Sequence, residues 1–262
     1  MTRPDRSAAE QFHDSDVVES YGHRPDYPPE LYDALLDLAP SRDCILDLGC
    51  GPGKIARAIA ARVKEVYAVD PSPLMLSLGQ SLDAGRHPNI RWIESAAETL
   101  ELSPGALDLA VAGASIHWMR PEDVFPNLVD ALRPSGIIAI VDGDEPAQAP
   151  WHSAYLTVIS GWVERLGGKW KGPAHQALMT AHTPWIDEGG ELVFVSSVEQ
   201  SLEDFLASQH SRATWSRARM GELANAFDDD IRAALTPWTR DGKISFEVHS
   251  RLLWGRPRRA AR

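Results

Sequence analysis

Residues 45–60 read ILDLGCGPGKIARAIA, and this stretch decides the fold. Ile45, Leu46 and Leu48 form the short apolar run of a buried strand, and apolar residues recur at helical spacing after Pro52. Three glycines fill the turn between the two segments. A strand, a glycine turn and a helix in this order present the backbone N–H groups of a helix N-terminus to a ligand. The stretch therefore predicts a ligand-binding turn at the end of a strand in an α/β fold.

Composition limits what can surround this turn. With 262 residues, of which 44% are hydrophobic, the chain is long enough for one large α/β domain over residues 1–262. The formal net charge of −11 disfavours nucleic acid and anionic membranes as partners. Cys44 and Cys50 are the only cysteines, too few for a disulfide framework, and the first residues lack an apolar signal sequence. No apolar run reaches the length of a membrane span, so we expect a cytoplasmic protein.

Apolar strand-like segments alternate with helical patterns along the first half of the chain. The predicted strands are Cys44–Leu48, Val66–Asp70, Ile90–Glu94, Leu107–Ala112 and Ile137–Asp142. The predicted helices are Pro28–Ala39, Gly53–Arg62, Pro73–Leu82 and Glu122–Leu132, with a short helix near Ala97. Strands with few polar positions that are joined by helices indicate a parallel sheet covered by helices on both faces.

The pattern changes beyond the fifth predicted strand. Residues 145–190 are rich in Trp, His, Gly and Pro and predict a helical insertion or lid within the domain. Two strands follow, Leu192–Val198 and Ile244–Trp254, separated by the helices Leu202–Gln209 and Met220–Leu235. Alternation of apolar and polar residues in the last strand is typical of an antiparallel edge strand. The predicted fold is thus α/β: a doubly wound sheet of about seven strands, mostly parallel, with an antiparallel edge strand.

Three classes of ligand use a glycine turn of this kind: nucleoside triphosphates, dinucleotides and S-adenosylmethionine. A P-loop needs Gly, four residues and then Gly-Lys-Ser/Thr, but Leu48 stands at the first glycine position and Ile55 at the Ser/Thr position. The dinucleotide pattern needs a third glycine where this chain has Lys54, because Gly53 comes one residue early. These departures favour S-adenosylmethionine.

Two carboxylates sharpen the choice. Asp47, two residues before the first glycine, would face a pyrophosphate unfavourably, whereas the sulfonium and ammonium groups of S-adenosylmethionine tolerate a nearby acid. Asp47 either contacts the ligand or only accepts hydrogen bonds from the backbone of the turn. Asp70 ends the second predicted strand, where it can accept hydrogen bonds from ribose hydroxyls. Its structural alternative is an N-cap, since Pro71 and Ser72 open the next helix.

Five segments, in order and at family-like spacing, resemble the motifs of class I S-adenosylmethionine-dependent methyltransferases. They are Ile45–Gly53, Asp70–Leu76, Ser95–Glu98, Leu107–Val111 and Leu132–Gly136. More narrowly, Tyr21–Pro28, Ile116–Trp118 and Leu253–Arg256 resemble the small-molecule subgroup that includes trans-aconitate methyltransferase. The resemblance implies a Rossmann-like sheet and S-adenosylmethionine as cofactor, with S-adenosylhomocysteine as product. It spans almost the whole chain and is weakest over residues 145–190.

The resemblance also implies where the cofactor lies. Gly49 and Gly51 would approach its methionine part, Met75 would pack on the adenine, and Tyr21 and Arg24, from an N-terminal segment over residues 1–40, would close over it. Arg24 either lies near the cofactor carboxylate or forms a surface ion pair. The full set of expected cofactor-binding residues is Tyr21, Arg24, Asp47, Gly49, Cys50, Gly51, Asp70, Pro71, Met75, Ala97, Glu98 and Ala114.

The expected acceptor is a small molecule that is methylated on a carboxylate or hydroxyl oxygen by direct in-line displacement. Because the sulfonium already activates the methyl group, the protein needs to supply alignment and exclusion of water, and no metal is required. The expected acceptor-pocket residues are Tyr27, His117, Trp118, Trp151 and Arg212. His117 is either a general base or a pocket wall. Trp151 belongs either to a lid over the acceptor or to the lid's own core, and Arg212 either pairs with an acceptor carboxylate or is a surface arginine.

Three alternative functions stay open on the sequence: a small-molecule N-methyltransferase, an NAD(P)-binding oxidoreductase, and a protein that binds S-adenosylmethionine without catalysis. Lys54 and Asp47 argue against the oxidoreductase. The sequence predicts neither the acceptor nor the oligomeric state.

Overall fold

The structure is a computed structural model that describes residues 15–170, 182–212 and 214–259. Its framework is one eight-stranded sheet in the order β3-β2-β1-β4-β5-β8-β6, with β7 paired to β8. The strands are β1 (Cys44–Leu48), β2 (Glu65–Asp70), β3 (Ile90–Glu94), β4 (Leu107–Gly113), β5 (Leu132–Asp142), β6 (Pro146–Ala147), β7 (Ile186–Ser201) and β8 (Lys243–Pro257). The first five are parallel, and β8 runs antiparallel to β5, β6 and β7.

Helices cover both faces of the sheet, which confirms the doubly wound prediction. The helices α3 (Pro29–Leu38), α4 (Lys54–Ile59) and α5 (Pro73–Asp83) lie on one face, and α6 (Pro121–Ala131) lies on the other. Short 3-10 helices are η2 (Ala60–Arg62), η3 (Ala97–Thr99) and η4 (Ile116–Trp118). The five residues of β1 are all buried, because Ile45 faces α3 and α4 while Leu46 and Leu48 face α6.

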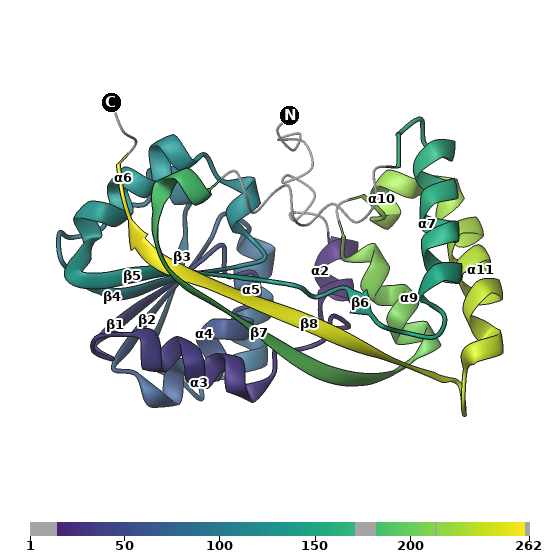
Figure 1. Ribbon diagram of the computed structural model, residues 1–262, viewed down its shortest axis with the longest axis horizontal. Helices are drawn as coiled ribbons and strands as arrows, with labels where there is room; N and C mark the ends of the chain where they lie inside the picture. Colours follow the sequence, from purple (N-terminus) through teal and green to yellow (C-terminus); the bar gives the residue numbers. More distant parts are fainter. Residues whose placement is uncertain (1–14, 171–181, 213, 260–262) are drawn as a thin grey trace.

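A helical lobe stands beside the sheet and packs on the far ends of β7 and β8 (Figure 1). Its helices are α7 (His152–Arg165), α9 (Leu202–His210), α10 (Arg217–Met220) and α11 (Ala224–Leu235), with the 3-10 helices η6 (Gly221–Leu223) and η7 (Thr236–Trp238). Aromatic and aliphatic side chains form its separate core: Trp151, Tyr155, Trp162, Phe205 and Phe227 are buried together. The long β7–β8 pair thus carries this lobe out from the sheet.

The structure corrects four details of the predicted elements. β5 begins at Leu132 and not at Ile137, because Leu132 already pairs with Leu107 of β4. β8 is not the edge strand, because β7 pairs along its whole length and β5 pairs on its other side. β7 begins at Ile186, after the 3-10 helix η5 (Thr183–Trp185), and runs through the glycine pair at 189–190. These glycines let the strand cross the Trp254 ring, since a Cβ at Gly190 would lie 2.5 Å from Trp254 Cζ2. The predicted helix Met220–Leu235 is broken at Gly221, whose φ is +54°.

The sequence reading also missed the helix α2 (Ser15–Tyr21), which leads into the segment over the glycine turn. Val17 and Val18 are buried on this helix against Met75 of α5. The roles proposed for residues 1–40 as a cover and for 145–190 as a lid stay predictions, and residues 1–14 and 171–181 lie outside the described residues. Among the residues that are described, no helix has both the length and the apolar character needed to cross a bilayer.

Candidate functional site

The candidate site lies at the carboxyl ends of β1, β2 and β4. The chain leaves β1 towards β2 on one side, and β4 lies on its other side, so the strand order reverses between β1 and β4. Open α/β sheets bind their ligands at such a switch point. The glycine turn follows β1, Asp70 ends β2, and Ala114 and Ser115 follow β4. Residues far apart in the sequence therefore meet at one edge of the sheet.

The glycine turn adopts a conformation that favours glycine at every second position. The φ angles of Gly49, Gly51 and Gly53 are +68°, +54° and +71°. A Cβ at Gly49 would also lie 2.6 Å from the Cβ of Ser115, whose hydroxyl donates to the Leu48 carbonyl at 2.6 Å. The N–H groups of residues 49 and 50 donate to the Val69 carbonyl, which ties the turn to β2. The turn is thus fixed from both neighbouring strands.

Asp70 is buried beside this turn, as its predicted role requires. The Gly51 N–H donates to its Oδ2 at 2.8 Å, and the Ser72 N–H donates to its Oδ1 at 2.9 Å. A carboxylate oxygen can accept more than one hydrogen bond, so the two backbone bonds are compatible with ribose hydroxyls as further donors. The helix N-cap is Ser72, whose Oγ accepts from the Met75 N–H at 3.2 Å. Ser72, and not Asp70, is therefore the N-cap of α5.

Asp47 is bound to the backbone of the next helix. Its Oδ2 accepts from the Ala56 N–H at 2.9 Å, and the side chain is 1% exposed. Burial raises the pKa of Asp47 to about 7, with a further contribution from Asp70, although the Ala56 hydrogen bond opposes the shift. Two carboxylates beside one turn form a negative environment, which suits a cationic ligand better than a pyrophosphate.

The predicted adenine contacts lie around the start of α5 and η3. Met75 is 1% exposed and packs under α2, while Ala97 packs into the core on the α6 face. Glu98 accepts at 3.0 Å from the N–H of Arg120, the residue that precedes α6. Pro71 is exposed at the end of β2. Contact of these side chains with adenine stays a prediction.

Tyr21 is the last residue of α2 and Arg24 follows in the segment before α3, and both reach the site. A Cβ at Gly51 would lie 3.5 Å from the Tyr21 hydroxyl, so this side chain covers the turn. Arg24 stacks on the Tyr21 ring, with 4.5 Å from Cζ to the ring centroid. Its Nε and Nη2 donate to the Oγ and carbonyl of Ser211, both at 2.7 Å. Arg24 is therefore not an exposed arginine: its side chain is 11% exposed and connects the segment before α3 to the helical lobe.

Asp144, which follows β5, joins three parts of the chain. Its Oδ2 accepts from Arg24 at 3.2 Å and its Oδ1 accepts from Arg212 at 3.3 Å. Arg212 also lies 3.4 Å from Glu145, and its Nε is buried without a hydrogen-bond partner. Burial disfavours the charge of Arg212, but Asp144 and Glu145 outweigh it and raise its pKa. The predicted Arg212 is thus partly buried, 17% exposed, and shares Asp144 with Arg24.

The remaining predicted pocket residues divide between the site and the lobe. His117 and Trp118 lie in η4, directly after the site residue Ser115, with ring centroids 4.8 Å apart. The Tyr27 hydroxyl lies 3.6 Å from where a Gly113 Cβ would stand, and burial raises the pKa of Tyr27. Trp151 instead lies in the lobe core, 1% exposed, where its Nε1 donates to the Ser245 carbonyl. That placement corresponds to the lid-core alternative.

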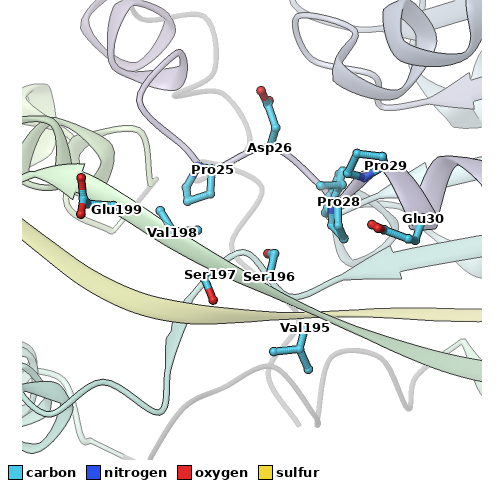
Figure 2. Close-up of a pocket in the computed structure, with 11 residues that line it drawn as sticks. Pro25, Asp26, Pro28, Pro29, Glu30, Val195, Ser196, Ser197, Val198 and Glu199 are labelled. Atoms are coloured by element: carbon cyan, nitrogen blue, oxygen red, sulfur yellow. The ribbon is translucent and has the colours of Figure 1, made fainter.

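An open groove of about 560 Å³ runs beside Tyr27 on the outer edge of the molecule. Figure 2 shows its two walls, the proline-rich residues 25–30 on one side and residues 195–199 of β7 on the other. Because Tyr27 lines the groove and also reaches the end of β4, it stands between the groove and the sheet edge.

Some residues of the site escaped the sequence reading. Ser115 donates to the Leu48 carbonyl at the start of the turn, and Ser211 accepts from Arg24. Lys54 contacts the segment before α3. A single serine outside a motif does not indicate a site from sequence alone. Lys54 was noted only because the dinucleotide pattern needs a glycine at its position. Asp144 lies in the acidic stretch Asp142–Glu145, and its position just after β5 was the available signal. Among the described residues, no group of three metal-binding side chains is present.

Comparison with known proteins identifies the family of the chain. Residues 45–136 match a family model described as a methyltransferase domain. An uncharacterized methyltransferase of Mycobacterium bovis is 33% identical over 148 residues, which cover 55% of this chain and 74% of that protein. A protein of Saccharomyces cerevisiae that is provisionally named an S-adenosylmethionine-dependent methyltransferase is 25% identical over 83% of this chain and 79% of its own length.

Other relatives and structures agree with this. An uncharacterized methyltransferase of Mycobacterium tuberculosis is 33% identical over 55% of this chain. The chain spans about half the length of that relative, 52%. The structure of a candidate type II methyltransferase from Anaeromyxobacter dehalogenans superposes with a TM-score of 0.70 at 23% identity, covering 89% of this chain and 97% of that one. The switch-point glycine turn, the buried acid at the end of β2 and these matches agree: the chain belongs to the class I S-adenosylmethionine-dependent methyltransferases.

Proposed function

We propose that this protein transfers the methyl group of S-adenosylmethionine to a small-molecule acceptor. The observation that carries the proposal is the buried Asp70 carboxylate, which lies at the end of β2 beside the glycine turn and accepts from the Gly51 N–H. The cofactor, when bound, supplies a methyl group that its sulfonium makes electrophilic. The chain's own residues bind and orient it, and they keep water out.

The residues present fit this cofactor. Gly49 and Gly51 supply the left-handed backbone that the turn needs, and the buried Asp47 and Asp70 favour positive charge over a diphosphate. Tyr21 covers the turn from the other side. The proposed cofactor site also includes Arg24, Cys50, Pro71, Met75, Ala97, Glu98 and Ala114. Ala114 has a φ of +50°, an uncommon conformation for a residue other than glycine, and such strain gathers at functional sites.

We propose a carboxylate or hydroxyl oxygen as the atom that is methylated. Support for an acidic acceptor comes from Arg212, which is partly buried, lies 3.3–3.4 Å from its acid partners, and has a buried Nε donor that lacks an acceptor. His117 and Tyr27 lie beside the end of β4, where His117 would accept a proton from a hydroxyl acceptor. A carboxylate acceptor is already ionised at neutral pH and needs no base.

A second candidate is N-methylation of an amine. Three acids at the end of β5 and directly after it, Asp142, Asp144 and Glu145, favour a cationic acceptor at the same edge. The two reactions leave chemically different products. Tritiated methyl incorporated from the cofactor into a metabolite extract would be released as volatile methanol by mild alkali from an ester, and it would remain bound in an amine or ether.

Transfer of label to any metabolite separates an enzyme from a protein that only binds the cofactor. Cofactor choice is tested by thermal shift: S-adenosylhomocysteine at a hundredfold excess over Kd should raise the melting temperature by about 5 °C, while NAD should not. A shift with NAD alone would favour the oxidoreductase and overturn the proposal. We infer a cytoplasmic location from Cys44 and Cys50, which are both free thiols.

A further inference from the structure

Lys54 makes contacts that the glycine-turn role does not require. It is the first residue of α4, directly after the turn, and its side chain is only 15% exposed. Its ammonium donates to the Arg24 carbonyl at 2.6 Å and to the Pro25 carbonyl at 3.0 Å, and it lies 3.1 Å from the Asp26 carboxylate. A lysine ammonium has three donors, so all three are engaged by one short segment.

Residues 22–28 of that segment have no regular secondary structure, and several of their carbonyls accept from side chains. Three successive carbonyls, those of residues 23, 24 and 25, accept from side chains of other elements: Gln200 of β7 for the first and Lys54 for the next two. Buried carbonyls that lose their donors are costly. Lys54 therefore sets how this segment lies relative to the glycine turn.

The same segment carries the two side chains that close over the turn. Tyr21 stands over Gly51, and the Arg24 guanidinium points away from its own carbonyl contact towards Ser211 and Asp144. Burial lowers the pKa of Lys54, while Asp26 opposes the shift. A desolvated ammonium is stable only while its acceptors stay in place, so release of the segment from Lys54 is unfavourable.

We propose that Lys54 is a positioning residue, which holds residues 21–26 over the glycine turn and so raises the affinity for the cofactor without touching it. This inference rests on the proposed function, because it assumes that the cofactor binds at the turn. Lys54 stands where a dinucleotide site needs a glycine. In this chain the lysine at that position holds residues 21–26 over the turn. Since coupling between sites is reciprocal, bound cofactor should in turn hold the segment more firmly.

A double-mutant cycle in the full chain tests this. Lys54→Met removes the three donors and keeps the length of the side chain. We expect the Kd for S-adenosylhomocysteine, measured by isothermal titration calorimetry, to rise about tenfold or more in the wild-type background. In a Tyr21→Ala/Arg24→Ala background the same change should raise it less than about threefold, because the segment no longer contributes. The exposed Lys64 gives the matched control: Lys64→Met should leave the Kd within about twofold.

An equal rise in both backgrounds would show that Lys54 acts on the cofactor directly, and an unchanged Kd would show no coupling; either result overturns the proposal. Lys54→Arg, which keeps the charge, should recover part of the affinity. If Lys54→Met does not fold, Asp26→Asn, at the exposed end of the same contact, takes its place in the cycle. Failure of the wild type to bind S-adenosylhomocysteine would overturn the proposed function instead. Amide exchange at residues 21–26 separates that case, because Lys54→Met should speed it without any ligand.

Discussion

At the scale of single residues, the two acids beside the turn do different work. Asp70 bonds the turn and the start of α5, whereas Asp47 bonds the backbone of α4. Both were predictable as buried acids, because each ends or interrupts a strand that is otherwise apolar. Their partners were not predictable, since a carboxylate can reach several N–H groups of one turn and only packing selects among them.

Asp70→Ala should weaken binding of S-adenosylhomocysteine by about 1–3 kcal/mol, because a charged hydrogen-bond acceptor is lost. Calorimetry on the folded variant measures the change. Asp83 is a suitable control, because this carboxylate is also buried but lies at the other end of α5. It accepts a hydrogen bond of 3.1 Å from the His87 N–H. Asp83→Ala should lower the melting temperature and leave the Kd unchanged. Wild-type affinity in Asp70→Ala would remove Asp70 from the ribose site.

Asp47 makes a prediction about pH. Because burial holds the pKa of Asp47 at about 7 in the folded state, above the ordinary carboxyl value of about 4, folding favours its protonated form. The stabilisation is complete below about pH 4 and is lost as pH rises through 7, with an upper bound of about 4 kcal/mol. Asp47→Asn should lack this loss. Urea unfolding at pH 5 and pH 8 compares the two, and identical pH slopes would show that Asp47 titrates normally.

At the scale of elements, the sequence predicts the first four strands well and the later ones less well. The apolar runs of β1–β4 and their glycine and proline boundaries depend on local chemistry, and the observed bounds lie within a residue of the predicted ones. The extent of β7 depends on contact with β8 and with Trp254, about sixty residues away. No local pattern records that contact, so the glycine pair at 189–190 looks like a loop.

The turn after β5 depends on one glycine. Gly143 has a φ of +89°, and a Cβ there would lie 2.0 Å from the His249 carbonyl oxygen. Gly143→Ala should therefore lower the free energy of unfolding by about 2–4 kcal/mol and displace the neighbouring Asp144. Gly161, in the exposed face of α7 with no atom near its missing Cβ, is the matched control. Gly161→Ala should add about 0.5–1 kcal/mol, and equal effects in denaturant titrations would contradict the account.

At the scale of the whole molecule, the site is completed where the sheet, the N-terminal segment and the helical lobe meet. Asp144 bonds Arg24 from the segment and Arg212 from the lobe, and its side chain is 11% exposed. The sequence placed Arg24 and Arg212 near the cofactor and the acceptor only through a resemblance. It gave no sign that both share one carboxylate, because the three residues are spread over nearly 190 positions.

Asp144→Asn should lower the free energy of unfolding by about 1–3 kcal/mol, because two buried guanidinium groups lose a charged partner. Glu191→Gln, which breaks an exposed pair with Arg251, should cost less than about 1 kcal/mol. Chemical denaturation measures both. Equal costs would mean that Asp144 behaves as a surface charge and that the three parts are not joined through it.

The central claim is that the turn after β1 binds a cationic adenosyl cofactor and not a dinucleotide. Calorimetric titration of the full chain with S-adenosylhomocysteine, and separately with NAD, tests it most directly. We expect S-adenosylhomocysteine to bind at one site per chain, with a lower affinity in Asp70→Ala, and we expect no heat of binding with NAD. Saturable binding of NAD, with no uptake of S-adenosylhomocysteine at millimolar concentration, would contradict it.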